Sequence, residues 1–249
     1  MPRRSAPRND LPAFTLAEVL ITLGVIGIVA ALTLPSVISN TQNNAKAQRI
    51  KKVYSVIQQA TNKSIFDNGD VTDWYNEAAY SSGFSASLEI FERVVKPYYN
   101  IAQLCVSGSN NASGFRVCGY KDEYIYTLNG IIVMEVSRLK IPIVLSDGSV
   151  LIFRPVKSNL SKDESKPVWG YYWTVYYDDN GPKPPNKLGK DVFVFDISPF
   201  LNKVVPNGLY SSISDSVLKS YSNIKNECLN SLGMSCAALI MLDDWKIKY

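Results

Sequence analysis

The chemistry open to this chain is limited first by the side chains it lacks. Its 249 residues contain no histidine. That absence excludes Ser-His and Cys-His nucleophile pairs, histidine-containing zinc sites and an imidazole pH switch. The sequence also contains no nucleophile elbow, no P-loop and no glycine-rich dinucleotide loop. We therefore expect no catalytic residues and no enzymatic activity.

One group of oxygen donors could hold a metal ion. Asp178, Asn180 and Asp191 lie in a stretch rich in glycine and proline, with Asp179 and Asn186 as further donors. Calcium takes six to eight such oxygens and tolerates irregular geometry. The spacing begins like an EF-hand loop but lacks the glutamate at its twelfth position. The other interpretation is a turn in which Asx side chains bind their own backbone. No other cofactor is expected.

The four cysteines could form disulfides or a zinc site. They are Cys105, Cys118, Cys228 and Cys236. Four cysteines allow three pairings. We expect Cys105 to pair with Cys118 and Cys228 with Cys236, because each pair closes a short local loop. A four-cysteine zinc site would use C-x-x-C hairpins, which these spacings do not provide.

The first forty residues predict a membrane segment. Residues 1–13 are polar and carry three arginines against one acid, and an uncharged run of 20 residues, 19–38, follows. As a helix this run reaches about 30 Å, the thickness of the hydrocarbon core. The basic end should stay in the cytoplasm while the rest of the chain crosses the membrane. Glu18 stands at the start of the run and needs a cation, because an unpaired carboxylate near hydrocarbon costs at least a few kcal/mol.

Two ordinary membrane segments compete with a more specialised one. A cleaved secretory signal has a shorter apolar stretch and an A-x-A-like site, neither of which is found here. A plain single-pass anchor would tether an extracytoplasmic binding domain or enzyme, and it leaves Glu18 without a purpose. The tether is kept as the alternative.

Residues 13–21, Ala-Phe-Thr-Leu-Ala-Glu-Val-Leu-Ile, resemble the class III signal of type IV pilins and type II secretion pseudopilins. The resemblance implies that a membrane peptidase cuts between Ala13 and Phe14 on the cytoplasmic side and N-methylates Phe14. Glu18 is the fifth residue counted from Phe14, as in the family. Position 13 departs from the family, which mostly has glycine there.

The resemblance also implies a mode of assembly. Glu18 would pair with the methylated amine of Phe14 on a neighbouring subunit and thereby fix the axial register, because an unpaired buried charge is penalised. The partners implied are other pilin or pseudopilin subunits, the prepilin peptidase and methyltransferase, and the inner membrane. The protein would begin as a single-pass inner-membrane protein and then enter an extracytoplasmic fibre. Many pilins have a C-terminal disulfide loop like that of Cys228 and Cys236, and some pseudopilins have a calcium loop.

Gly24, Gly27 and Pro35 lie inside the apolar run. One interpretation is the ordinary tolerance of membrane helices for glycine and proline. The other is close helix packing at the glycines and a flexible stretch at Pro35, which removes one backbone donor. Both interpretations are kept.

The pattern of the whole chain predicts an α+β, pilin-like fold in which a long N-terminal helix packs on an antiparallel sheet. We expect four parts: a leader over 1–13, a membrane and assembly helix over 14–38, its amphipathic continuation over 39–67, and an extracytoplasmic β-rich domain over 68–249. In that domain we expect strands over 124–128, 131–136, 141–145, 150–153, 171–177 and 192–197, with helices over 88–95 and 214–232. Two further strands, 237–241 and 245–249, should close the sheet.

The net charge gives little support to nucleic-acid binding. The chain has 26 lysines and arginines against 22 acids, a net charge of +4, and a hydrophobic share of 46% that suits a packed core. This surplus is too small and too evenly spread for dedicated nucleic-acid binding. A DNA-uptake pilin is therefore a weaker alternative. The length of the processed chain favours a minor subunit over an abundant one.

Overall fold

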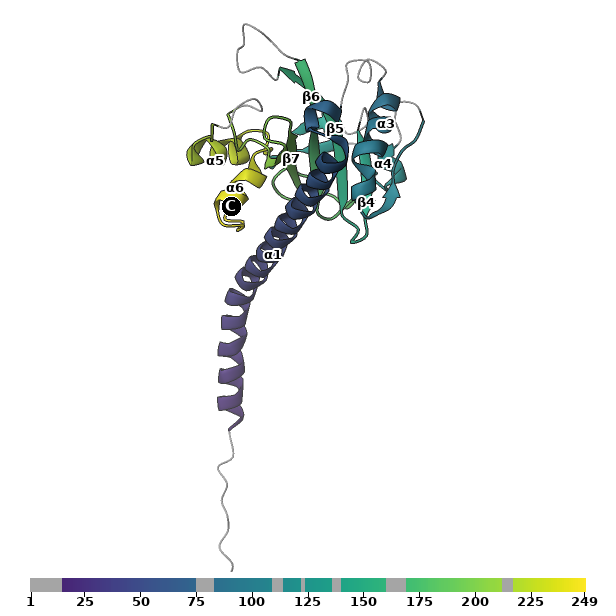
Figure 1. Ribbon diagram of the computed structural model, residues 1–249. Helices are drawn as coiled ribbons and strands as arrows, with labels where there is room; N and C mark the ends of the chain where they lie inside the picture. Colours follow the sequence, from purple (N-terminus) through teal and green to yellow (C-terminus); the bar gives the residue numbers. More distant parts are fainter. Residues whose placement is uncertain are drawn as a thin grey trace, which may run out of the picture. The chain divides into compact units, whose positions relative to one another are not determined.

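The computed structural model describes residues 15–74, 83–108, 114–121, 124–135, 140–159, 169–211 and 217–249. The chain divides into two compact units, Met1–Asn44 and Ala45–Tyr249. The helices are α1 (Leu16–Asn68), η1 (Val71–Trp74), α3 (Phe84–Val94), η2 (Lys96–Tyr98), α4 (Gly114–Val117), α5 (Tyr221–Asn230) and α6 (Cys236–Leu242) (Figure 1). The strands are β1 (Ile101–Leu104), β2 (Tyr124–Tyr126), β3 (Ile132–Glu135), β4 (Ile141–Leu145), β5 (Val150–Asn159), β6 (Trp169–Asp178), β7 (Val192–Ser198) and β8 (Lys203–Pro206).

The second unit is built on an antiparallel sheet of six strands in the order β1-β4-β5-β6-β7-β8. From β4 to β8 each strand pairs with the next one in the chain, so the sheet is a meander with β1 added at one edge. The β5–β6 pair is the longest and runs in register from Val150↔Asp178 to Asn159↔Trp169. Strands β2 and β3 form a separate two-stranded sheet.

One face of the large sheet packs against the second half of α1, residues 45–68. Ile50, Val53 and Ile57 recur at helical spacing and are buried among side chains of the sheet. Phe153 and Trp173 lie in the same cluster, with ring centroids 6.1 Å apart. Burial of each such side chain contributes about 1.5–3 kcal/mol, so this layer is the main core of the unit.

The opposite face of the sheet is buried as well. Along β5, Ile152 points to this second face while Phe153 belongs to the first, because side chains alternate along a strand. Phe115 from α4 and Ile125 from β2 cover Ile152 and Tyr176 there. Figure 1 shows α4 beside β4, and α5 and α6 at the side of β7.

The coarse fold prediction is confirmed: the protein is α+β, with a long N-terminal helix and an antiparallel sheet. The expected strands at 237–241 and 245–249 are wrong. Residues Cys236–Leu242 form α6, and no strand is assigned to 245–249. Trp245 packs its ring on Tyr54 of α1 instead, at a centroid distance of 5.5 Å. A short apolar run cannot be assigned to helix or strand by periodicity alone, which explains the error.

The helix expected over 214–232 is shorter than predicted. It is α5, and it begins after Ser220, whose hydroxyl accepts a hydrogen bond from the Asn223 N–H at 3.3 Å. This is an ordinary N-cap. The helix expected over 88–95 is α3, which begins earlier, at Phe84.

Candidate functional site

The first half of α1, residues 16–44, carries an exposed apolar surface. Every large apolar side chain from Leu16 to Ile38 is between 42% and 77% exposed. Among the described residues, α1 is the one helix long and apolar enough to cross a membrane. A helix that is apolar all round requires an apolar environment, either lipid or other helices.

Glu18 closes a capping box at the start of α1. Its carboxylate accepts hydrogen bonds from the Thr15 N–H at 2.9 Å and the Thr15 hydroxyl at 2.8 Å, and the Thr15 hydroxyl accepts one from the Glu18 N–H at 3.2 Å. This is the T-x-x-E arrangement that satisfies free N–H groups at a helix start. Glu18 therefore has polar partners in its own chain, although none of them is a cation. The predicted processing residues, Ala13 and Phe14, lie outside the described residues.

Gly24, Gly27 and Pro35 all lie within α1, which continues without interruption through Pro35. A Cβ added at either glycine would meet no atom within 4 Å. Each glycine thus leaves room for a close neighbour, so both interpretations of these residues stay predictions.

Basic residues of the second half of α1 bind turns of the sheet. Arg49 forms two hydrogen bonds of 2.6 Å with the Asp179 carboxylate, and the Asp179 side chain is only 3% exposed. The Lys46 ammonium donates to the Lys190 carbonyl at 2.7 Å, and Lys52 lies 3.6 Å from Asp147. The hydrogen bond and charge of Asp179 raise the pKa of Arg49. The Arg49 and Lys46 contacts attach α1 to the β6–β7 loop, residues 179–191, and the Lys52 contact attaches it to the β4–β5 turn.

The donors predicted to bind calcium lie at the end of β6 and in the β6–β7 loop. Asp178 is 1% exposed and accepts hydrogen bonds from the Tyr120 hydroxyl at 2.6 Å and the Asn180 N–H at 3.3 Å. Asp191 is 3% exposed and accepts from the N–H groups of Asn186 at 3.1 Å and Lys187 at 2.5 Å. Burial raises the pKa of Asp178 to about 8, and repulsion from Asp191 adds to the effect.

These contacts bear on the two interpretations of the loop in different ways. The Asn180 N–H bonded to Asp178 is the Asx turn that the sequence offered as the alternative. The buried side-chain oxygens of Asn180 and Asn186 have no hydrogen-bond partner, as an ion site would require. Among the described residues, no three His, Cys, Asp or Glu side chains are grouped to hold a metal. Calcium binding stays a prediction. A rise in melting temperature on addition of calcium, lost in the Asp178→Asn variant, would support it.

Both disulfides have the pairing expected from the short loops. Cys105 is bonded to Cys118, and Cys228 to Cys236. The first joins the end of β1 to α4, whose Phe115 packs on Tyr120. The second joins α5 to α6. Two glycines lie close to this second bridge. A Cβ at Gly189 would overlap the Cys236 side chain, and a Cβ at Gly208 would overlap the neighbouring Ser235.

Two residues of functional interest, Thr15 and Asp196, were not predicted from the sequence. Thr15 was not assigned a role, although its spacing from Glu18 is the signature of a capping box. Asp196 was overlooked because it lies in an otherwise apolar strand, and its burial depends on β6 and β8 on either side. The first could have been found from the sequence, whereas nothing in the local pattern indicates the second.

Comparison with protein families matches residues 36–249 to a family of unknown function, DUF6613. No curated protein and no solved structure matches the chain. The match begins just after Pro35 and includes all the strands of the sheet. Because it spans most of the sequence, the chain belongs to the DUF6613 family.

Proposed function

We propose that the protein is a structural subunit of an extracytoplasmic fibre of the type IV pilin or type II secretion pseudopilin kind. It would be inserted in the inner membrane through α1, cut before Phe14, and polymerised through the first half of α1. The second unit would form the fibre surface. The protein would have no catalytic activity.

The observation that carries this proposal is the contrast within α1. One stretch of the helix buries Ile50, Val53 and Ile57 in its own unit, while the other leaves every large apolar side chain exposed. The exposed stretch suits lipid before assembly and neighbouring helices after it. Residues 13–21, which resemble the prepilin signal, stand at its start.

The polar start of the exposed stretch supports assembly over simple anchoring. The Thr15 hydrogen bonds stabilise the Glu18 carboxylate but do not neutralise it. In a bundle of apolar helices the remaining charge favours a position next to a cation, and an N-terminal amine is the cation that processing before Phe14 would create. A tether needs no such group.

Mass spectrometry of protein purified from its native host tests processing. The proposal expects a chain that begins with N-methylated Phe14. An intact chain beginning at Met1 in the membrane fraction would instead favour the membrane tether. In that case the second unit would be a binding domain or an enzyme held at the membrane.

The Glu18→Ala variant tests assembly separately from processing. We expect it to be inserted and cut normally but to yield at least ten-fold less sheared fibre, because the register contact is lost. Glu89→Ala, at an exposed position of α3, is the matched control and should assemble like the wild type. Normal fibre yield from Glu18→Ala would refute the register role.

A further inference from the structure

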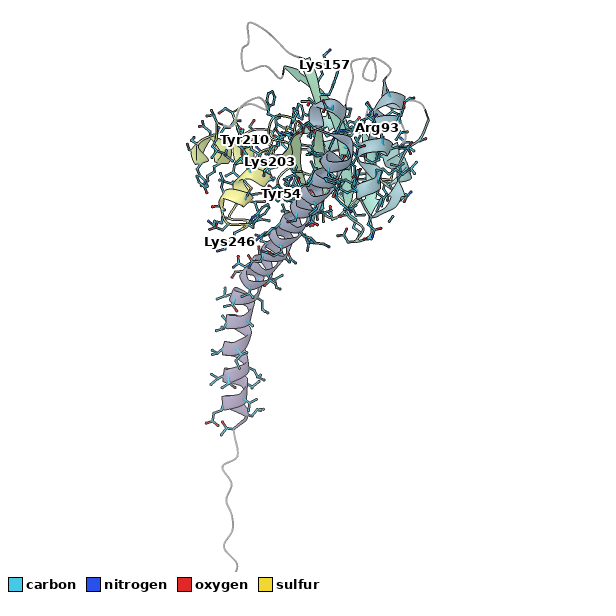
Figure 2. The ribbon with its side chains drawn as sticks, in the orientation of Figure 1. Tyr54, Arg93, Lys157, Lys203, Tyr210 and Lys246 are labelled. Atoms are coloured by element: carbon cyan, nitrogen blue, oxygen red, sulfur yellow. A yellow bond between two sulfur atoms is a disulfide. The ribbon has the colours of Figure 1, made fainter. Side chains whose placement is uncertain are left out.

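A cavity of about 210 Å³ opens over β7 and β8 in the second unit. Its lining includes Tyr172 from β6, Asp196 and Ser198 from β7, Asn207 after β8, and Tyr210. Tyr210 is labelled in Figure 2. Asp196 lines this cavity. The hydrogen bonds and charge of its carboxylate therefore determine which ligand the cavity would bind.

Asp196 is a buried carboxylate whose hydrogen-bond partners are neutral. The residue is 5% exposed. One of its oxygens accepts from the Thr174 hydroxyl at 2.8 Å and the other from the Asn207 amide at 2.7 Å. An ionised carboxylate offers about four acceptor sites, so about two stay open. In the described part of the chain, no lysine or arginine forms an ion pair with Asp196.

The charge of Asp196 is not cancelled by the other charged groups near the cavity. Lys219 also lines it, but its ammonium is bound to Glu227 at 2.7 and 2.9 Å. Arg154 of β5 is exposed and lies opposite Thr174, two strands from Asp196. Burial raises the pKa of Asp196 to about 6, so the carboxylate is mostly ionised at neutral pH. An ionised group in this position is stabilised by a cation.

The tyrosines complete the features expected of a cation site. Burial, followed by the charge of Asp196, raises the pKa of Tyr172 to about 12, so its hydroxyl stays neutral and can accept a hydrogen bond. Tyr172 and Tyr210 also supply aromatic rings, whose faces attract cations. The volume admits an alkyl ammonium group of a few carbons.

We propose that this cavity binds a primary ammonium group, with Asp196 as its counter-ion and Tyr172 and Tyr210 as its walls. An ammonium has three donors on a rotatable bond and can use whichever acceptor sites remain open. The group could come from a free amine or from a lysine side chain of another protein. The site does not depend on fibre assembly and would exist in a tethered protein as well.

The test is an NMR titration of the full chain in detergent micelles at pH 8. The probe is n-butylammonium, the neutral control is n-butanol, and the reporter is the Asn207 side-chain amide. We expect a saturable shift of that amide with the ammonium and none with the alcohol. Equal shifts from both compounds, or no saturable shift from the ammonium, would overturn the proposal.

Variants and pH then identify the counter-ion. Asp196→Asn should weaken ammonium binding at least ten-fold, whereas Asp243→Asn, at a buried carboxylate outside the cavity, should leave it unchanged. Wild-type protein at pH 5 provides a second measurement that needs no variant. Because Glu227 has a lowered pKa and keeps its charge there, protonation of Asp196 should weaken binding about ten-fold. Unchanged affinity at pH 5 would rule out Asp196 as the counter-ion.

Two further probes distinguish the sources of the ammonium. Nα-acetyl-lysine amide represents a lysine side chain, and 1,5-diaminopentane represents a free amine. Tighter binding of the lysine compound assigns the cavity to a partner protein, and tighter binding of the diamine assigns it to a small molecule. Preference for methylguanidinium over all of these would overturn the choice of ammonium.

Discussion

The two halves of α1 belong to one helix but have opposite surroundings. Between Leu16 and Ile38 the large apolar side chains are exposed, whereas Ile50, Val53 and Ile57 are at most 5% exposed. Both halves carry apolar side chains that favour burial, yet only those of the second half are buried within their own unit. Helix formation and helix burial are therefore separate requirements, and the apolar side chains of the first half are left uncovered by their own unit.

Deletion of residues 1–44 should have the largest effect on this comparison. We expect the remaining unit, Ala45–Tyr249, to move completely from the membrane fraction to the soluble fraction and to unfold cooperatively. The reason is that the uncovered apolar surface is removed while the core cluster stays intact. Membrane flotation and a thermal melt followed by circular dichroism measure both outcomes. A fragment that stays with the membrane would show that the second unit has its own lipid contact.

Single truncations on the two halves should differ sharply. Phe153→Ala removes a fully buried ring that packs on Phe91, Tyr99 and Trp173. We expect it to lower the free energy of unfolding by about 3–5 kcal/mol. Leu20→Ala, at an exposed position of the first half, should leave it unchanged. Denaturant unfolding of the full chain in micelles provides the comparison, and a cost at Leu20 similar to that at Phe153 would contradict it.

The buried acids of the second unit should make its stability depend on pH. The folded pKa of Asp178 is about 8 and that of Asp196 about 6, both above the ordinary value of 3.8. The folded state therefore holds protons that the unfolded state releases, and stability falls as pH rises from about 4 to 8. We expect a loss of about 5 kcal/mol between pH 5 and pH 8, most of it from Asp178.

Denaturant unfolding at several pH values measures this slope. Asp178→Asn should flatten it, especially above pH 6. Asp147→Asn is the control, because the pKa of Asp147 is lowered and its titration lies below this window. A slope that persists in Asp178→Asn would assign the effect to other groups.

The smallest effect is expected at the attachment of α1 to the β6–β7 loop. Arg49→Met leaves the buried Asp179 carboxylate with the Tyr177 hydroxyl as its one remaining hydrogen-bond donor known from the described residues. We expect a cost of about 1–3 kcal/mol. Lys52→Met, which breaks an exposed pair with Asp147, should cost less than about 1 kcal/mol. Equal costs in urea unfolding would show that the burial of Asp179 does not matter.

The sequence predicted those parts of the fold that local pattern determines. The amphipathic continuation expected over 39–67 is the second half of α1, and the strands expected over 124–128 and 131–136 form the β2–β3 pair. The loop lengths favoured the two disulfides. Each of these features depends on residues close together in the chain.

Features set by distant residues could not be predicted in this way. The apolar run that became α6 matched strand and helix equally, and its disulfide with α5 and its packing at the sheet edge are tertiary effects. The cavity around Asp196 needs Thr174, Asn207 and Tyr210 from three segments. Ala13 and Phe14 lie outside the described residues, so their processing stays a prediction.

The crowding around the second disulfide limits how this protein can change. Gly189 and Gly208 come from separate loops, and both have a left-handed backbone. Gly189 lies against Cys236, and Gly208 lies against the preceding residue, Ser235. A larger residue at either position must displace Ser235 or Cys236, and it would also strain the backbone of its own loop. A library of substitutions should therefore tolerate almost nothing at these two positions, while neighbouring surface positions accept many residues. Dyes or affinity handles are better placed far from this spot.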